Sequence, residues 1–132
     1  MAGVIGVFGY TAYSGAKFAI KGFSDALRSE LKPKGIKVSI VYPPDTNTPQ
    51  LAWEDQYKPF ETRELAGSDK PIQPSQVAKE TLKAVARGRY KVVPGLSAKL
   101  TYFVATRLGN WFNPIVDFLI SRATKKKARL EK

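Results

Sequence analysis

The 132-residue chain contains no cysteine and no histidine. Disulfide bonds, metal sites built from thiolate or imidazole ligands, and catalysis by a cysteine or histidine nucleophile are therefore excluded. Scattered carboxylates such as Glu54 and Asp55 are interpreted as solvated surface, so we expect no metal site. The N-terminus shows no charged segment followed by an apolar one, so no secretory signal is visible. No apolar run approaches the ~20 residues that span a bilayer.

Tyr13 and Lys17 form a Tyr-x-x-x-Lys spacing at the start of a predicted helix. Residues four apart share one helix face, with Cβ atoms about 5–6 Å apart. Tyrosines ordinarily keep the phenolic proton up to a pKa of about 10, too high for proton exchange near neutral pH. A neighbouring cation favours the phenolate, so the spacing indicates a general acid or base with a lysine activator. The alternative is a chance pairing whose lysine extends to solvent.

The surrounding pattern predicts an α/β unit. The helix is expected to run to Pro33, with an apolar stripe that continues from Tyr13 and Lys17 and faces the core. The stripe consists of Ile20, Phe23, Leu27 and Leu31. Further elements are expected as follows: a strand over Ile36–Tyr42, a helix with Ser75 as its N-cap, and a second short strand over Tyr90–Val93. The end of the first strand, at Pro43, should face a ligand crevice.

Residues from Met1 to about Pro94 resemble the short-chain dehydrogenases/reductases. The segments that carry the resemblance are Thr11-Ala12-Tyr13-Ser14-Gly15-Ala16-Lys17-Phe18-Ala19, Leu27-Arg28-Ser29-Glu30-Leu31, Gly35-Ile36-Lys37-Val38 and Tyr42-Pro43-Pro44-Asp45-Thr46-Asn47-Thr48-Pro49. The resemblance implies that Tyr13 protonates the carbonyl oxygen of a ketone, and that Lys17 activates it and holds the nicotinamide ribose. The turn after the strand grips the nicotinamide carboxamide in this family. The implied cofactor contacts are therefore Tyr13, Lys17, Pro43, Pro44, Asp45, Thr46 and Thr48.

Pro44 stands where most members of the family have glycine. In this respect the turn is similar to that of the 3-ketodihydrosphingosine reductases, a subfamily that reduces a long-chain 3-ketosphinganine with NADPH. The approach Phe8-Gly9-Tyr10-Thr11-Ala12-Tyr13 and the later Lys58-Pro59-x-Glu61-Thr62 are also similar to that subfamily.

Two features of the family are missing from the sequence: the glycine-rich turn that cradles the cofactor pyrophosphate, and the serine that polarises the carbonyl upstream of the tyrosine. We therefore interpret the chain as the C-terminal portion of a Rossmann-like doubly wound parallel sheet that lacks its N-terminal cofactor-binding half. The isolated chain should then be inactive. The residues that distinguish NADP(H) from NAD(H) belong to the missing half, so the sequence favours NADP(H) by resemblance alone. We expect a homo-oligomer at full length.

Aromatic residues follow the proline turn at Trp53, Tyr57 and Phe60. In the family this segment is a mobile helical lid over cofactor and substrate, so these side chains are candidates for a groove that holds an alkyl chain. The alternative is that they only pack the lid onto the body of the protein.

The sequence predicts two parts: a catalytic and substrate-lid half over residues 1–95, and a basic amphipathic extension over residues 96–132. Residues 79–132 carry thirteen Lys and Arg against three Asp and Glu, so they hold +10 of the net charge of +11. Short apolar helices with a basic end favour a position in the interface of an anionic membrane, and we expect a cytoplasmic protein, peripheral on that membrane.

Two other partners for the extension are nucleic acid, for which no base-reading module is visible, and a partner subunit. A non-catalytic membrane-binding or subunit-interface fragment with a reductase-like shape is accordingly the alternative to an enzyme.

Overall fold

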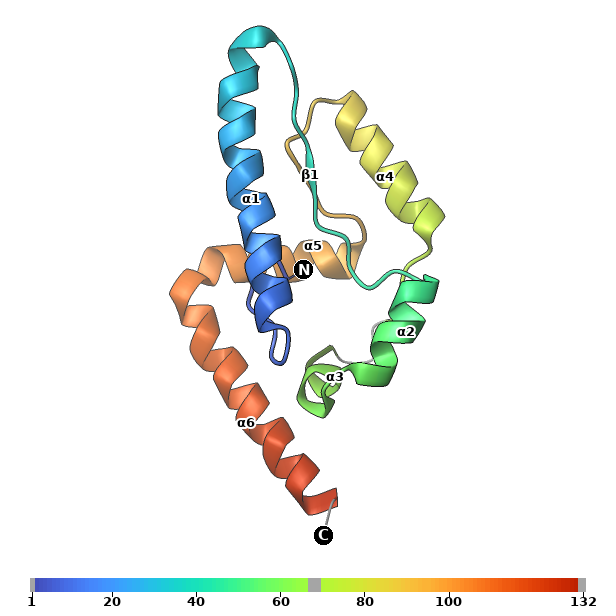
Figure 1. Ribbon diagram of the computed structural model, residues 1–132, viewed down its shortest axis with the longest axis vertical. Helices are drawn as coiled ribbons and strands as arrows, with labels where there is room; N and C mark the ends of the chain where they lie inside the picture. The colour runs from blue at the N-terminus through green and yellow to red at the C-terminus, as the bar shows by residue number, and fades with distance from the viewer. Residues whose placement is uncertain (1, 67–69, 131–132) are drawn as a thin grey trace.

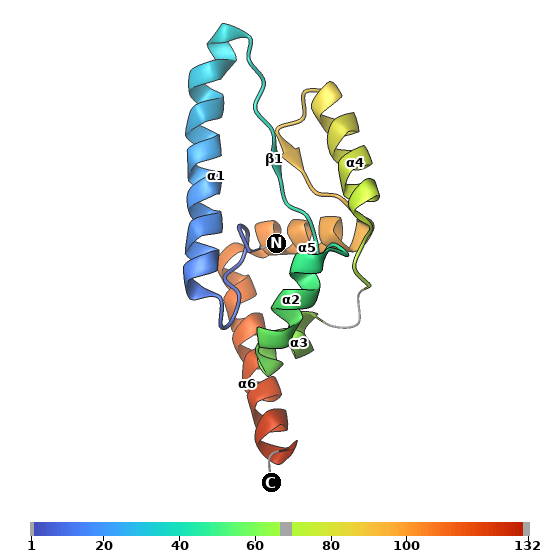
Figure 2. The ribbon, with the colours of Figure 1, turned by 45° about the vertical axis from the view of Figure 1, so that its right-hand side comes forward.

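The computed structural model describes residues 2–66 and 70–130, which form six α-helices, two short strands and two 3-10 turns (Figures 1 and 2). The elements are α1 (Thr11–Leu31), η1 (Lys32–Lys34), β1 (Ile40–Val41), α2 (Pro49–Tyr57), α3 (Phe60–Ala66), α4 (Pro74–Ala86), β2 (Lys91–Val92), α5 (Leu96–Leu108), η2 (Gly109–Trp111) and α6 (Phe112–Leu130).

The first helix confirms the sequence prediction. α1 begins at Thr11, so that Tyr13 and Lys17 lie in its first two turns. The helix is followed by η1, which contains Pro33, and η1 ends at Gly35, whose φ is +74°. Glycine adopts this left-handed conformation without the steric cost that a side chain would add. The chain then turns back alongside α1 into β1 (Figure 1).

The strands are parallel, as an α/β protein requires, but shorter than the predicted Ile36–Tyr42 and Tyr90–Val93. Ile40 pairs with Lys91 and Val41 with Val92. The backbone N–H of Tyr42 still donates to the carbonyl of Val92, at 2.8 Å. A strand is defined by its neighbour, and within the described residues Ile36–Ser39 have no partner strand, which accounts for the difference. The result is a mostly helical α/β arrangement with a small parallel sheet.

The buried core is made chiefly of small side chains. The buried apolar residues are Ala2, Ile40, Tyr42, Ala84, Val92, Ala98, Ala105 and Ala123. Alanines let helices approach closely but remove little apolar area from water, and hydrophobic stabilisation scales with that area. Larger side chains meet between the end of β1 and α5, where the Tyr42 and Tyr102 rings lie 5.5 Å apart between centroids.

The apolar stripe of α1 corrects a sequence prediction. We expected it to face the core, but Ile20 is 49% exposed and Phe23 is 68% exposed. Leu27 and Leu31 are only partly buried. The reason is geometric: α1 meets the sheet region through Asp25 and Arg28, which both contact Tyr90, and these two residues do not belong to the stripe. A two-stranded sheet is too narrow to bury the whole helix.

The C-terminal third is helical. α5 crosses below the sheet, and α6 continues from it along α3 (Figure 1). Short apolar helices were predicted here, and none of the described helices has the length and apolar content to span a bilayer.

The predicted N-cap at Ser75 is wrong, because Gln73 occupies the cap position and Pro74 opens α4. Proline is favoured in the first turn, since its missing N–H has no helical partner there.

Tyr90 joins the sheet to α1. Its hydroxyl donates to Asp25 Oδ1 at 2.6 Å, and the Arg28 guanidinium lies 4.9 Å from its ring centroid. Burial, together with the Asp25 carboxylate, raises the pKa of Tyr90 from 10.0 to about 12.

The raised pKa predicts an alkaline dependence of stability. The folded state favours the protonated phenol, so its contribution is complete below pH 10.0 and disappears as pH rises through about 12. Tyr90→Phe should therefore lose stability relative to wild type at neutral pH, and this difference should shrink across that window. Chemical denaturation at several pH values measures it, with the exposed Tyr57→Phe as control. A pH-independent difference would contradict the assignment.

Candidate active site

Tyr13 and Lys17 meet as the helical spacing predicts. The Lys17 ammonium lies 5.0 Å from the centroid of the Tyr13 ring. Tyr13 is 43% exposed, and Lys17 is partly buried. The phenol can thus exchange a proton with a bound molecule while a cation stays beside it.

A tight loop holds the start of α1. The buried Ser14 hydroxyl accepts a hydrogen bond from the Val7 N–H at 3.2 Å, and the Tyr10 N–H donates to the Val7 carbonyl at 3.0 Å. The rings of Tyr10 and Tyr13 meet edge to face, with centroids 5.9 Å apart. The loop therefore fixes the direction from which a ligand reaches Tyr13.

The lid helices are fastened to the same loop. Thr62, buried at the start of α3, donates to the Phe8 carbonyl at 2.6 Å. Gly9 has φ +77° and lies against Pro59. Burial raises the pKa of Tyr10, and the nearby carboxylates of the lid add to the effect while Lys58 opposes it. The segment after the proline turn therefore contacts the loop that leads into α1, while its role as a lid stays a prediction.

Lys58 connects the lid to the proline turn. Its ammonium is 2.7 Å from Asp55 Oδ1 and 3.5 Å from Asp45 Oδ2. Burial alone would lower the pKa of Lys58, but the Asp55 and Asp45 carboxylates outweigh burial and raise it above its ordinary value.

The turn after β1 is ordered by its own hydrogen bonds. Thr46 Oγ1 donates to the Pro44 carbonyl at 2.9 Å. The Thr48 hydroxyl caps α2 by accepting from the Leu51 N–H at 3.2 Å. As an acceptor, this hydroxyl keeps its own proton free to donate. The cofactor role of the turn stays a prediction.

Among the described residues, the predicted substrate residues Trp53, Tyr57 and Phe60 line neither of two surface hollows. The rings of Trp53 and Tyr57 lie 5.0 Å apart between centroids, tilted by 52°. These residues are 60% and 69% exposed, whereas Phe60 is partly buried. A hollow beside Gly35 and a larger groove between α3 and α6 are lined by other residues. Their role in binding an alkyl chain also stays a prediction.

Sequence reasoning missed two contacts that position the site. Ser14 lies inside the motif, yet nothing in its spacing indicates that it holds the loop. Thr62 is fifty-four residues from Phe8, and no local pattern shows such a pairing. Within the described residues, no group of three carboxylates is placed to hold a metal ion.

Comparison with known proteins gives a consistent set of relatives. Residues 1–58 match the family described as short chain dehydrogenase. The chain is 34% identical over 152 residues to 3-ketodihydrosphingosine reductase of Bos taurus, covering 98% of this chain and 46% of the relative. It is 48% identical over 89 residues to 3-dehydrosphinganine reductase of Danio rerio, covering 67% of this chain and 27% of the relative.

A third relative, 3-ketodihydrosphingosine reductase of Dictyostelium discoideum, is 38% identical over 119 residues, which are 90% of this chain and 36% of the relative. The chain thus spans less than half the length of these curated relatives. No solved structure matches it.

Gly9 provides a test of the link between loop and lid. An added Cβ would lie 2.5 Å from Pro59 Cγ, at a backbone conformation that side chains rarely adopt. Gly9→Ala should therefore destabilise the fold by about 1–3 kcal/mol. Gly22→Ala is the matched control, because the space around this helical glycine is open, and it should stabilise by about 0.5–1 kcal/mol. Thermal denaturation compares the two, and equal shifts would show that the lid does not press on the loop.

Proposed function

Because residues 1–58 place the chain in the short chain dehydrogenase family, we propose that it is the catalytic and substrate half of a ketone reductase. The substrate is a long-chain 3-ketosphinganine-like lipid, in keeping with the names of the relatives. The observation that carries the proposal is the contact between Lys17 and Tyr13, 5.0 Å from ammonium to ring centroid at the start of α1. The rest of a Rossmann-like sheet would extend from β1.

The residues present fit the nicotinamide end of a cofactor. Tyr13 is exposed beside Lys17, and the Thr48 hydroxyl retains a proton to donate. Lys17 would hold the ribose hydroxyls, while Pro43, Pro44, Asp45, Thr46 and Thr48 would hold the carboxamide. The bound cofactor, NADP(H) in preference to NAD(H), would supply a hydride.

The chain's own chemistry is proton transfer. As the substrate carbonyl is reduced, Tyr13 gives its phenolic proton to the carbonyl oxygen, and Lys17 stabilises the phenolate left behind. The lid, held by Thr62 and Lys58, would exclude water from this step, with Trp53, Tyr57 and Phe60 along the alkyl chain of the substrate.

The exposed faces support proposals about partners. Ile20 and Phe23 are exposed on α1, which suits a face covered in the longer protein or by a second copy in a homo-oligomer.

Leu96, Leu100 and Phe103 are exposed on α5, and the basic end of α6 follows. We propose that this extension lies on an anionic membrane as a peripheral segment at the cytoplasmic side. The alternative function, a non-catalytic membrane-binding or subunit-interface fragment, draws on the same exposed faces and requires no turnover.

Removal of the Tyr13 hydroxyl tests the reductase directly. In the protein extended to the length of its relatives, Tyr13→Phe should lower kcat about 10²–10⁴-fold while the fold stays intact. Steady-state reduction of a 3-keto lipid by NADPH measures this, and Tyr10→Phe, which alters the neighbouring ring, should lose much less. A Tyr13→Phe enzyme within about threefold of wild type would remove the assignment and favour the non-catalytic alternative.

Neutralising the tail tests the membrane proposal. The variant replaces four basic residues by glutamine: Lys125, Lys126, Lys127 and Arg129. The protein should thereby lose nominally about 4 kcal/mol of attraction to anionic lipid. Even half of this should lower partitioning onto anionic vesicles more than about tenfold, and added salt should weaken wild-type binding by screening. Co-sedimentation with vesicles measures both. In the protein extended to the length of its relatives, turnover of a short, water-soluble ketone should stay unchanged. Binding that is insensitive to charge and salt would exclude this proposal.

A further inference from the structure

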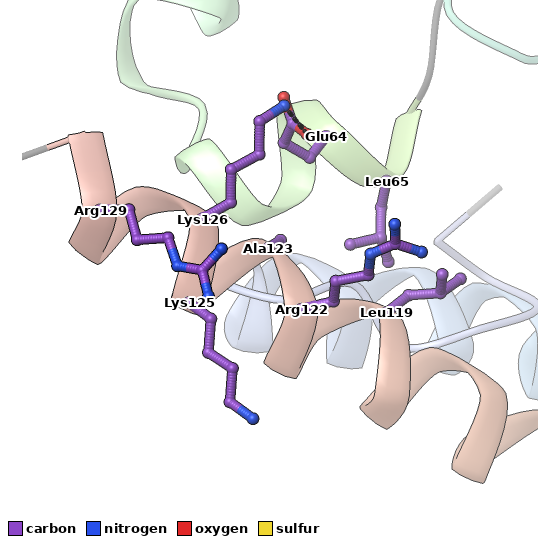
Figure 3. A pocket seen from close by; sticks show the side chains of 8 residues that line it. All are labelled: Glu64, Leu65, Leu119, Arg122, Ala123, Lys125, Lys126 and Arg129. Atoms are coloured by element: carbon purple, nitrogen blue, oxygen red, sulfur yellow. Dashed lines mark hydrogen bonds and ion pairs between the residues drawn. The ribbon is translucent and has the colours of Figure 1, made fainter.

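A basic groove lies between the lid helix and the C-terminal helix. It encloses about 680 Å³ between α3 and α6 and is lined by Glu64, Leu65, Leu119, Arg122, Ala123, Lys125, Lys126 and Arg129 (Figure 3). The close-up shows Lys126 reaching from α6 to Glu64 on α3, a contact of 2.7 Å. Four cations thus line the groove against one carboxylate, which balances only one of them.

The face of α6 that borders this groove changes character along its length. Ile115, Leu119, Arg122, Lys126 and Arg129 follow one another at steps of four and three, so they share one face. Ile115 lies one turn before the groove, and the other four line it. Ile115 and Leu119, in the first half, are exposed. The second half of the face is basic. Interfacial helices usually separate apolar and polar side chains around their circumference, whereas here the separation runs along the axis.

Such a face matches a ligand with an anionic end and an apolar end. We propose that the α3–α6 groove binds the phosphate headgroup of an anionic phospholipid, with Arg122, Lys126 and Arg129 at the phosphate and the acyl chain along Leu119 and Ile115. Arginine suits this role because its planar guanidinium donates two parallel hydrogen bonds to a phosphate. The proposal rests on the proposed membrane docking of the extension and names the lipid class and the site.

Glu64 closes the groove when no anion is bound. Its ion pair with Lys126 is exposed on both sides, with 57% of the lysine and 38% of the glutamate side chain accessible. Exposed pairs contribute little to stability, so a phosphate can displace the carboxylate from Lys126. Since Thr62, on the same helix, is hydrogen bonded to the Phe8 carbonyl, the bound headgroup would contact the lid that lies beside Tyr13.

Vesicle binding by the full chain tests the groove. Arg122→Gln with Arg129→Gln should weaken binding to phosphatidylcholine vesicles that contain phosphatidic acid by about ten- to thirtyfold. The matched control is Lys32→Gln with Lys34→Gln, which removes the same charge at the far end of α1 (Figure 1) and should change binding less than about threefold. All four positions are exposed, and circular dichroism verifies equal helix content.

Glu64→Gln should act in the opposite direction, because it frees Lys126 for the phosphate. We expect several-fold tighter binding, and no change for Glu30→Gln, an exposed carboxylate on α1. Two results would contradict a specific lipid site in the groove: an equal loss of vesicle affinity in the Arg122/Arg129 and Lys32/Lys34 double variants, or an equal effect of Glu64→Gln and Glu30→Gln. Either result would indicate that the membrane attracts the basic surface as a whole.

The outcomes separate this proposal from the membrane docking on which it rests. No vesicle binding by wild type would overturn both. If the four-residue tail variant loses vesicle binding but the Arg122/Arg129 double variant keeps it, the groove proposal alone is overturned. Inorganic phosphate that displaces vesicles at constant ionic strength would identify a site for free phosphate instead. Dimerisation that the groove variants abolish without lipid would identify a contact between copies of the chain.

Discussion

The hydrogen bond from Thr62 to the Phe8 carbonyl, 2.6 Å long, is the constraint on which the rest of the site depends. It joins the lid, distant in sequence, to the loop that leads into α1. On one side of that loop Ser14 and Val7 fix the first turn of the helix, and with it Tyr13 and Lys17. On the other side Lys58 ties the lid to the turn after β1. Together with the Thr62 hydrogen bond, these contacts connect Tyr13, the proposed proton donor, to the α2–α3 segment and to the strand end.

The small core explains why so much of the surface looks like an interface. The residues buried on α4, α5 and α6 are alanines, and aromatic and aliphatic residues of α1, α5 and α6 stay exposed. Exposed apolar patches of this kind usually mark contact surfaces. The different faces suit different contacts: the α1 stripe is purely apolar and fits protein, whereas the α6 face ends in arginine and lysine and fits an anionic surface.

Local spacing predicted the helices and the proximity of Tyr13 and Lys17 better than it predicted the long-range contacts. The i to i+4 relation of Tyr13 and Lys17 is a property of one helix, so the sequence alone was sufficient to predict that the two side chains lie close together. The strands were overestimated because Ile36–Val38 have the right side chains but no described neighbour to pair with. The prediction that the apolar stripe of α1 faces the core was wrong, because the burial of a helix face depends on which element packs against it. The groove could not be foreseen, since Glu64 and Lys126 are sixty-two residues apart.

The most direct test of the central claim compares the two lysines that follow Tyr13 along α1. Lys17 contacts the Tyr13 ring, whereas Lys21, one turn later, is paired with Asp25 at 2.9 Å. In the protein extended to the length of its relatives, Lys17→Ala should weaken NADPH binding and reduce turnover of a 3-keto lipid. Lys21→Ala should retain both. If the two variants behave alike, the Tyr13–Lys17 pair has no special role, and the account of the chain as the catalytic half of a reductase is contradicted.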